Sequence, residues 1–145
     1  ASLSGKFSST STEAPVAYRP PAPGATPIAT QRRSIYFETN SAVMSPDSRA
    51  VVDEIGSFMR AYENTVVDIE GNSDSTGAHA YNVELSKERA ESVRTYLMQK
   101  YGYPAARMRP KGNGPDNPID TNNTPEGREK NRRTDIKVYP NPAAQ

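Results

Sequence analysis

Three side chains with complementary polar chemistry follow a glycine-rich turn in the middle of the chain. Asp74 offers a carboxylate, Asn82 an amide and Arg89 a guanidinium. Asn82 and Arg89 are seven residues apart, so they lie in line along one face of a helix. Asp74 lies in a loop bracketed by Gly71 and Gly77, which supply backbone freedom. The three groups can therefore face one small volume beside the free N–H groups of the helix N-terminus.

This combination suits a ligand that carries both charges. An ammonium would meet Asp74, and a carboxylate would meet Arg89, whose planar guanidinium can bind it in bidentate fashion. A simpler interpretation also fits: Asp74 makes a turn or a cap, and Arg89 pairs with Glu84 or Glu88 on a solvated helix face. Spacing alone favours the simpler interpretation.

Composition restricts the classes of function. The chain has 145 residues, and its 18 basic and 17 acidic residues leave a formal net charge of +1. This balance argues against nucleic acid or an anionic membrane as the main partner. No apolar run approaches the roughly 20 residues that a membrane span needs. With no Cys and a single His, a transition-metal site, a Cys nucleophile and a cofactor are not expected.

The periodicity of apolar residues predicts a domain of two layers. Alternation predicts strands near residues 34–38, 66–70, 107–111 and 134–140, the third at a sheet edge or bulge because of Pro110. Helical spacing predicts three helices: one capped by Ser45 with a buried stripe reaching Tyr62, one reaching about Lys100, and one from Thr124 through Asn131. We therefore expect an α+β sandwich with helices on one face of a small mixed sheet.

The first part of the chain has a different composition. Residues 1–33 are rich in Ser, Thr, Ala and Pro, with few large apolar side chains. Such a segment buries too little surface to offset its ordering entropy, so we predict a disordered linker over residues 1–33. An arm that packs on the domain is the alternative. The compact domain is expected over residues 34–140 and a tail over 141–145. The start at Ala1 rather than Met fits a processed or truncated piece of a larger protein.

Further motifs follow the loop and helix at characteristic spacings. After GNSDSTG and NVELSKERA come a G-x-G turn with a nearby Pro and then the run TNNTPEGREKNRR. The first Asn of this motif is Asn122 or Asn123, and its later polar residues are Arg128, Asn131, Arg132 and Arg133. Together, over about residues 34–140, these motifs closely resemble the OmpA-like peptidoglycan-binding domain. The resemblance implies the OmpA-C-like fold, a two-layer βαβαβ(α)β sandwich.

The resemblance also implies a binding site for the diaminopimelate residue in the stem peptide of peptidoglycan. In the family, the loop Asp and the helix Arg hold the free amino-acid end of diaminopimelate; these are Asp74 and Arg89 here. The helix Asn maps to Asn82, and the first Arg of the N-R-R motif maps to Arg132. Arg132 is therefore expected to reach the ligand.

Three positions depart from the family pattern. Asn40 stands where some members have Asp; it lacks a charge but can still donate and accept hydrogen bonds. Ser73 replaces a Thr and keeps the hydroxyl, and Asn72 replaces a frequent His or Tyr. Asn40 and Ser73 thus complete the expected ligand-binding set. Arg128 and Arg133 are expected to fix the short helix and the last strand by ion pairs.

The expected function is non-catalytic anchoring to peptidoglycan in the periplasm of a Gram-negative cell envelope, with the linker leading to a parent envelope protein or complex. Two alternatives stay open. One is a protein-interaction module that kept the fold and lost the ligand. The other is a peptidoglycan-active hydrolase, for which Glu38, Asp68 and Glu70 could supply carboxylates. The sequence leaves open whether the chain forms a homodimer.

Overall fold

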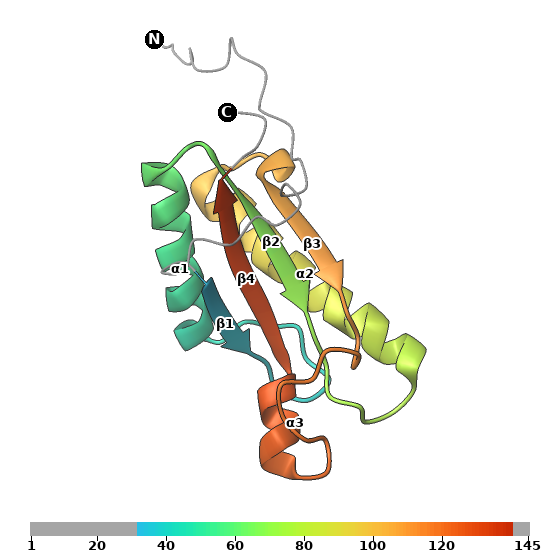
Figure 1. Ribbon diagram of the computed structural model, residues 1–145. Coiled ribbons are helices and arrows are strands. Elements are labelled where there is room, and N and C mark those ends of the chain that lie inside the picture. Colours follow the sequence, from blue (N-terminus) through green and yellow to red (C-terminus); the bar gives the residue numbers. More distant parts are fainter. Residues whose placement is uncertain (1–31, 141–145) are drawn as a thin grey trace, which may run out of the picture.

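The computed structural model describes residues 32–140 (Figure 1). Most of the expected linker, residues 1–31, and the expected tail lie outside the described residues. The elements, in chain order, are β1 (Arg32–Tyr36), α1 (Pro46–Ala61), β2 (Thr65–Gly71), α2 (His79–Tyr101), a 3-10 turn η3 (Ala105–Arg107), β3 (Met108–Gly112), α3 (Pro125–Asn131) and β4 (Arg133–Pro140). Their order agrees with the one predicted from periodicity. The first strand begins two residues earlier than expected, because Arg32 and Arg33 pair with β4.

The strands form one mixed sheet in the order β1-β4-β2-β3. β4 is antiparallel to both β1 and β2, whereas β3 is parallel to β2. β3 lies at the sheet edge, which is where Pro110 was expected to place it. α1 and α2 cover one face of the sheet, and the short α3 lies beyond the end where β4 begins (Figure 1). The fold is therefore the expected α+β sandwich.

The core lies between this face of the sheet and the two long helices. Alternate strand residues face inward, because side chains of a strand point to opposite faces in turn. Fully or almost fully buried apolar residues from all these elements form one cluster, including Ile35, Val67, Ile69, Ile136 and Val138 of the strands and Val52, Ile55, Met59, Val93 and Leu97 of the helices. This cluster holds the helices at a fixed position over the sheet.

α1 begins as expected and ends earlier than expected. The Ser45 hydroxyl accepts a hydrogen bond from the N–H of Ser48 at 3.1 Å, and Pro46 occupies the first turn. The prediction that the buried stripe reaches Tyr62 is wrong, because the helix ends at Ala61 and Tyr62 is 57% exposed. Its ring instead packs on Phe58 with a centroid distance of 4.5 Å.

The middle of α2 lies directly against the ends of β2 and β3. A Cβ atom at Gly71 would collide with the carbonyl oxygen of Ser86, and one at Gly112 would lie 2.7 Å from the backbone N of Lys87. The expected role of Gly71 is therefore wrong: φ is positive at Gly77 (87°) but not at Gly71, where glycine permits close approach. This approach brings Arg89 of α2 to the end of the sheet.

Candidate ligand-binding site

A small polar pocket of about 60 Å³ lies at the end of the sheet where β2 stops and α2 starts. The turn after β1, the loop after β2, the first turns of α2 and the end of α3 enclose it. Its lining residues are Thr39, Asn40, Ser73, Asp74, Thr76, Asn82, Leu85, Arg89 and Arg132. The structure thus brings together all six residues expected from the sequence. A larger hollow of about 390 Å³ lies between β1 and α1 and shares only Arg132 with this pocket.

Arg89 is the most deeply placed member of the pocket. Its side chain is fully buried, and its guanidinium donates to the backbone carbonyls of Ser41 (Nε, 2.8 Å), Asn72 (Nη1, 3.0 Å) and Glu38 (Nη2, 2.9 Å). The simpler interpretation, a solvated Arg89 paired with Glu84 or Glu88, is therefore wrong. Each Nη atom keeps a second N–H, so the guanidinium can still donate to a ligand carboxylate.

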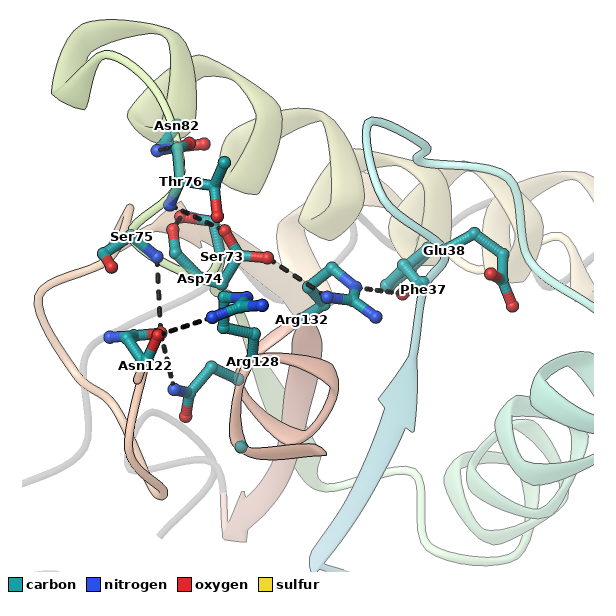
Figure 2. A network of polar contacts seen from close by, with 12 residues as sticks. Phe37, Glu38, Ser73, Asp74, Ser75, Thr76, Asn82, Asn122, Arg128 and Arg132 are labelled. Carbon is teal, nitrogen blue, oxygen red and sulfur yellow. Dashed lines mark hydrogen bonds and ion pairs between the residues drawn. The ribbon is translucent and has the colours of Figure 1, made fainter. Parts of the chain in front are cut away.

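Asp74 is held by two donors inside the pocket. Its Oδ2 lies 3.1 Å from Nη1 of Arg132, and its Oδ1 accepts the N–H of Thr76 at 2.8 Å (Figure 2). Desolvation by burial acts to raise the pKa of the Asp74 carboxyl, but the hydrogen bonds from Thr76 and Arg132 outweigh it and hold the pKa below its ordinary value. Asp74 is therefore ionised at neutral pH.

Arg132 bridges two walls of the pocket. Its Nη1 binds Asp74, and its Nε donates to the carbonyl of Phe37 at 3.2 Å (Figure 2). Arg132 also affects Arg89: burial and then the positive charge of Arg132 lower the pKa of Arg89, Asp74 acts to raise it, and the result is a pKa of about 10. The pocket therefore contains two cationic groups and one anionic group among its lining residues.

Short-range hydrogen bonds shape the loop that carries Asp74. Asn82 donates from Nδ2 to the carbonyl of Thr76 at 2.8 Å, and the Ser73 hydroxyl donates to the carbonyl of Asp74 at 2.9 Å. The N–H of Ser73 donates to the carbonyl of Gly114 at 3.0 Å. Asn82 and Ser73 therefore hold the loop in place, while both also line the pocket.

A second group of residues supports this loop from the side of α3, and sequence reasoning did not assign it that role. Oδ1 of Asn122 accepts from the N–H of Ser75 at 3.3 Å (Figure 2). It also accepts from Nδ2 of Asn131 at 2.9 Å. Asn122, not Asn123, is thus the Asn that contacts the loop. Arg128 donates to the carbonyl of Asn122 at 3.0 Å, and it forms no ion pair with another residue of the range 32–140, where one was expected. The signal was present, since these residues belong to the motif TNNTPEGREKNRR.

The second Arg of the N-R-R motif points away from Asp74. Arg133 forms an ion pair with Asp135 at 3.1 Å, as expected, and donates to the carbonyl of Asn117 at 3.0 Å. Neighbouring residues at the start of a strand point to opposite faces. Arg132 therefore serves the pocket, and Arg133 fixes β4 to the preceding loop.

Asn72 and Asn40, two of the three departures from the family pattern, have different structural consequences. Asn72 donates from Nδ2 to the carbonyl of Glu70 at 2.9 Å and accepts from Asn113 at 3.2 Å, and it does not line the pocket. Asn40 does line it, in the left-handed conformation (φ 57°), and its Oδ1 accepts from the hydroxyl of Tyr81 at 3.3 Å. Tyr81 was not expected near the site.

Other residues considered for a catalytic or metal-binding role lie outside this pocket. Asp68 and Glu70 are on the β2 face opposite the buried Val67 and Ile69, and Glu70 pairs with Lys137 at 3.5 Å. His79 is exposed and pairs with Asp116 at 3.0 Å. Within residues 32–140, no three His, Cys, Asp or Glu side chains are grouped as metal ligands. No helix in this same range is both long and apolar enough to cross a membrane.

The chain is similar to known envelope proteins. It is 37% identical over 107 residues to the probable lipoprotein YiaD of Escherichia coli, and the aligned region covers 74% of this chain and 48% of that protein. It is 37% identical over 127 residues to outer membrane protein A of Bordetella avium, with coverage of 86% and 64%. The chain thus spans about half to two thirds of the length of these relatives.

Structural comparison agrees with the sequence comparison. The peptidoglycan-associated lipoprotein of Burkholderia pseudomallei has a solved structure that superposes with a TM-score of 0.70 at 27% identity, covering 73% of this chain and 89% of that one. The model of the OmpA family matches residues 36–132, which include every pocket-lining residue. The chain therefore belongs to the OmpA family.

Proposed function

We propose that this domain binds diaminopimelate-containing peptidoglycan without covalent attachment, and that it anchors a larger envelope protein to the cell wall. It works as a peptidoglycan-binding domain in the periplasm of a Gram-negative cell envelope, like the relatives described as outer-membrane proteins and as a peptidoglycan-associated lipoprotein. The observation that carries the proposal is the pocket in which one carboxylate and two guanidiniums meet.

The pocket matches the chemistry of a free amino-acid end. Arg89 is fixed by backbone carbonyls and presents its remaining N–H groups, so a carboxylate would complete its hydrogen bonds without moving the side chain. Asp74, ionised and 8% exposed, is the acceptor available to an ammonium. Asn82 and Ser73 keep the Asp74 loop at the distance at which one small ligand can touch both walls.

The proposal is tested by co-sedimentation with purified sacculi. Arg89→Ala and Asp74→Ala should each reduce the bound fraction at least about tenfold, because each leaves a buried opposite charge without its partner. Arg94→Ala is the matched control: Arg94 lies on the same helix, pairs with Glu91 and is absent from the pocket. It should bind as the wild type does.

Folding must be checked alongside binding, because Arg89 bonds three backbone carbonyls. Arg132→Ala, at a side chain that is 15% exposed, supplies a second pocket variant with less risk to the core. Folded pocket variants that sediment like the wild type would refute the proposal. A folded wild type that does not sediment at all would favour the protein-interaction alternative.

A further inference from the structure

We infer that the hollow between β1 and α1 is a groove that binds an extended, positively charged segment of a partner protein along the free edge of β1. The inference goes beyond the proposed function, because this groove is a second surface of the domain. A domain anchored through its polar pocket can then hold a partner protein at the cell wall.

The groove is much larger than the polar pocket. Its volume is about 390 Å³, against about 60 Å³ for the pocket. The five consecutive residues 34–38 line it, so it follows the chain of β1 and the two residues after the strand. The loop before α1, the first turns of α1 and part of α3 form its other walls. A groove that follows a strand in this way suits an extended chain.

β1 is an edge strand, and only one of its sides is paired with another strand (Figure 1). The N–H of Phe37 donates to β4 at 2.9 Å, so the alternation of an antiparallel ladder turns the backbones of Ser34 and Tyr36 away from β4. The carbonyl of Tyr36 accepts from the hydroxyl of Ser48 at 3.4 Å. Within residues 32–140, no side chain caps the N–H of Tyr36 or the backbone groups of Ser34. These groups can pair with an added strand.

Exposed apolar side chains line the same groove. Tyr36 is 49% exposed and Val43 is 79% exposed, and Val51 of α1 is half-buried beside them. Covering these side chains removes apolar surface from water, which favours binding. The occupant therefore needs apolar side chains as well as a free backbone edge.

The charged side chains of the groove are mostly acidic. Glu38, Asp47 and Glu129 line it and are exposed, and within the range 32–140 none of them forms an ion pair. The one cation among the lining residues, Arg132, is already paired with Asp74 at 3.1 Å. Lys or Arg side chains of a partner therefore complement the groove.

The groove and the pocket can be occupied together. Arg132 lines both, but its Nη1 is held by Asp74 and its Nε by the carbonyl of Phe37, so an occupant of the groove does not displace it. Glu38 also serves both sides. Its carbonyl accepts from Arg89 at 2.9 Å, whereas its carboxylate extends away from Asp74 (Figure 2).

Titration of the full chain with a short basic peptide, followed by NMR, tests the inference. The probe is Ac-Lys-Val-Arg-Val-Lys-amide, and Ac-Glu-Val-Glu-Val-Glu-amide is its acidic counterpart. The basic peptide should bind with a dissociation constant of about 1 mM or below and shift the amide signals of Ser34 and Tyr36. The acidic peptide should bind at least about tenfold more weakly. The basic peptide methylated at every backbone nitrogen should lose at least about fivefold, because it cannot pair with β1.

Charge reversal at the groove supplies the matched variants. Glu38→Lys combined with Glu129→Lys should weaken binding of the basic peptide at least about tenfold, because two attractions become repulsions. The control is Glu63→Lys combined with Glu126→Lys, which changes the net charge equally at two exposed residues outside the groove. Its dissociation constant should stay within about twofold of the wild-type value.

The outcomes separate this inference from the proposed function, since sacculi binding is measured on the same proteins. If both peptides bind equally, or if the signals of Ser34 and Tyr36 do not move, the inference is wrong. If the wild type dimerises and Glu38→Lys with Glu129→Lys dissociates the dimer, the occupant is a second copy of this chain, and a partner protein is excluded. In each of these cases unchanged sedimentation with sacculi leaves the proposed function standing.

Discussion

Single residues of the pocket serve the fold and the site at once. Arg89 is bound to carbonyls of three segments, the turn after β1, the following loop and the end of β2. Arg132 joins Asp74 to the carbonyl of Phe37. Because the same donors define the shape of the pocket, the proposed ligand would meet a site that is already formed. Preorganisation of this kind reduces the ordering cost of binding.

The Asp74 carboxylate gives a prediction about acid stability. Because its pKa in the folded state lies below the ordinary value of 3.8, its contribution to stability is present above that value and is lost as the pH falls through the folded pKa. Asp74→Asn should therefore lower the free energy of unfolding at pH 7 and flatten its decline below about pH 4. Urea denaturation between pH 7 and pH 2.5 measures both effects. An equally steep decline in the variant would show that Asp74 does not carry this dependence.

At the scale of elements, hydrogen bonds connect α1 to the C-terminal end of α2, away from the pocket. Asp53 of α1 accepts from the hydroxyls of Tyr96 (2.9 Å) and Tyr101 (2.8 Å) and from Nζ of Lys100 (2.9 Å). Burial, followed by the hydrogen bond to Asp53, raises the pKa of Tyr101 to about 12. These hydrogen bonds join the middle of α1 to the C-terminal end of α2 over the shared core.

The hydrogen bonds at Asp53 predict that the free energy of unfolding falls at alkaline pH. A tyrosine whose pKa is raised on folding contributes stability that is present below its unfolded pKa, about 10, and is lost as the pH rises towards 12. Tyr101→Phe should lower the free energy of unfolding by about 0.5–1 kcal/mol at pH 8 and weaken its decline above pH 10. Thermal unfolding followed by circular dichroism checks this. Sacculi binding should not change, because the pocket lies elsewhere, and Tyr62→Phe, at an exposed ring, is the control.

Elements governed by local signals could be predicted from the sequence. The cap at Ser45, the left-handed C-cap at Gly102 (φ 74°) and the edge position required by Pro110 each depend on one residue and its neighbours. Features set by distant segments could not. The close approach at Gly71 depends on where α2 packs, and the three carbonyl partners of Arg89 come from segments that periodicity leaves unplaced.

The candidate site shows the same division. All six residues that the family resemblance assigned to the site line the pocket, because family motifs encode which residues meet. It did not show that Arg132 would pair with Asp74, or that Asn122 would hold the loop. Those contacts join residues 47 to 58 positions apart, and they depend on the path of the chain around α3.

At the scale of the whole molecule, β4 ends at the end of the sheet opposite the pocket, and β1 begins level with the middle of β4 and β2. The strand register pairs Arg32 with Lys137 and Thr65 with Pro140, whereas Gly71 at the pocket end pairs with Thr134 (Figure 1). The chain thus leaves β4 at the end of the sheet away from Asp74 and Arg89, and it enters β1 about halfway along the sheet. A protein attached upstream of β1 can therefore be tethered without covering the pocket.

This arrangement predicts that attachment at the N-terminus leaves binding intact. The chain has no Cys, so a single thiol can be placed at will. Protein coupled to a surface through Ala1→Cys should capture soluble muropeptides with a dissociation constant within about twofold of that in solution, because rigid-body access to the pocket is unchanged. Coupling through Ser75→Cys, in the exposed loop beside Asp74, should abolish capture. If protein coupled through Ala1→Cys captures as little muropeptide as protein coupled through Ser75→Cys, attachment upstream of β1 obstructs the pocket. The prediction that N-terminal attachment leaves binding intact is then wrong.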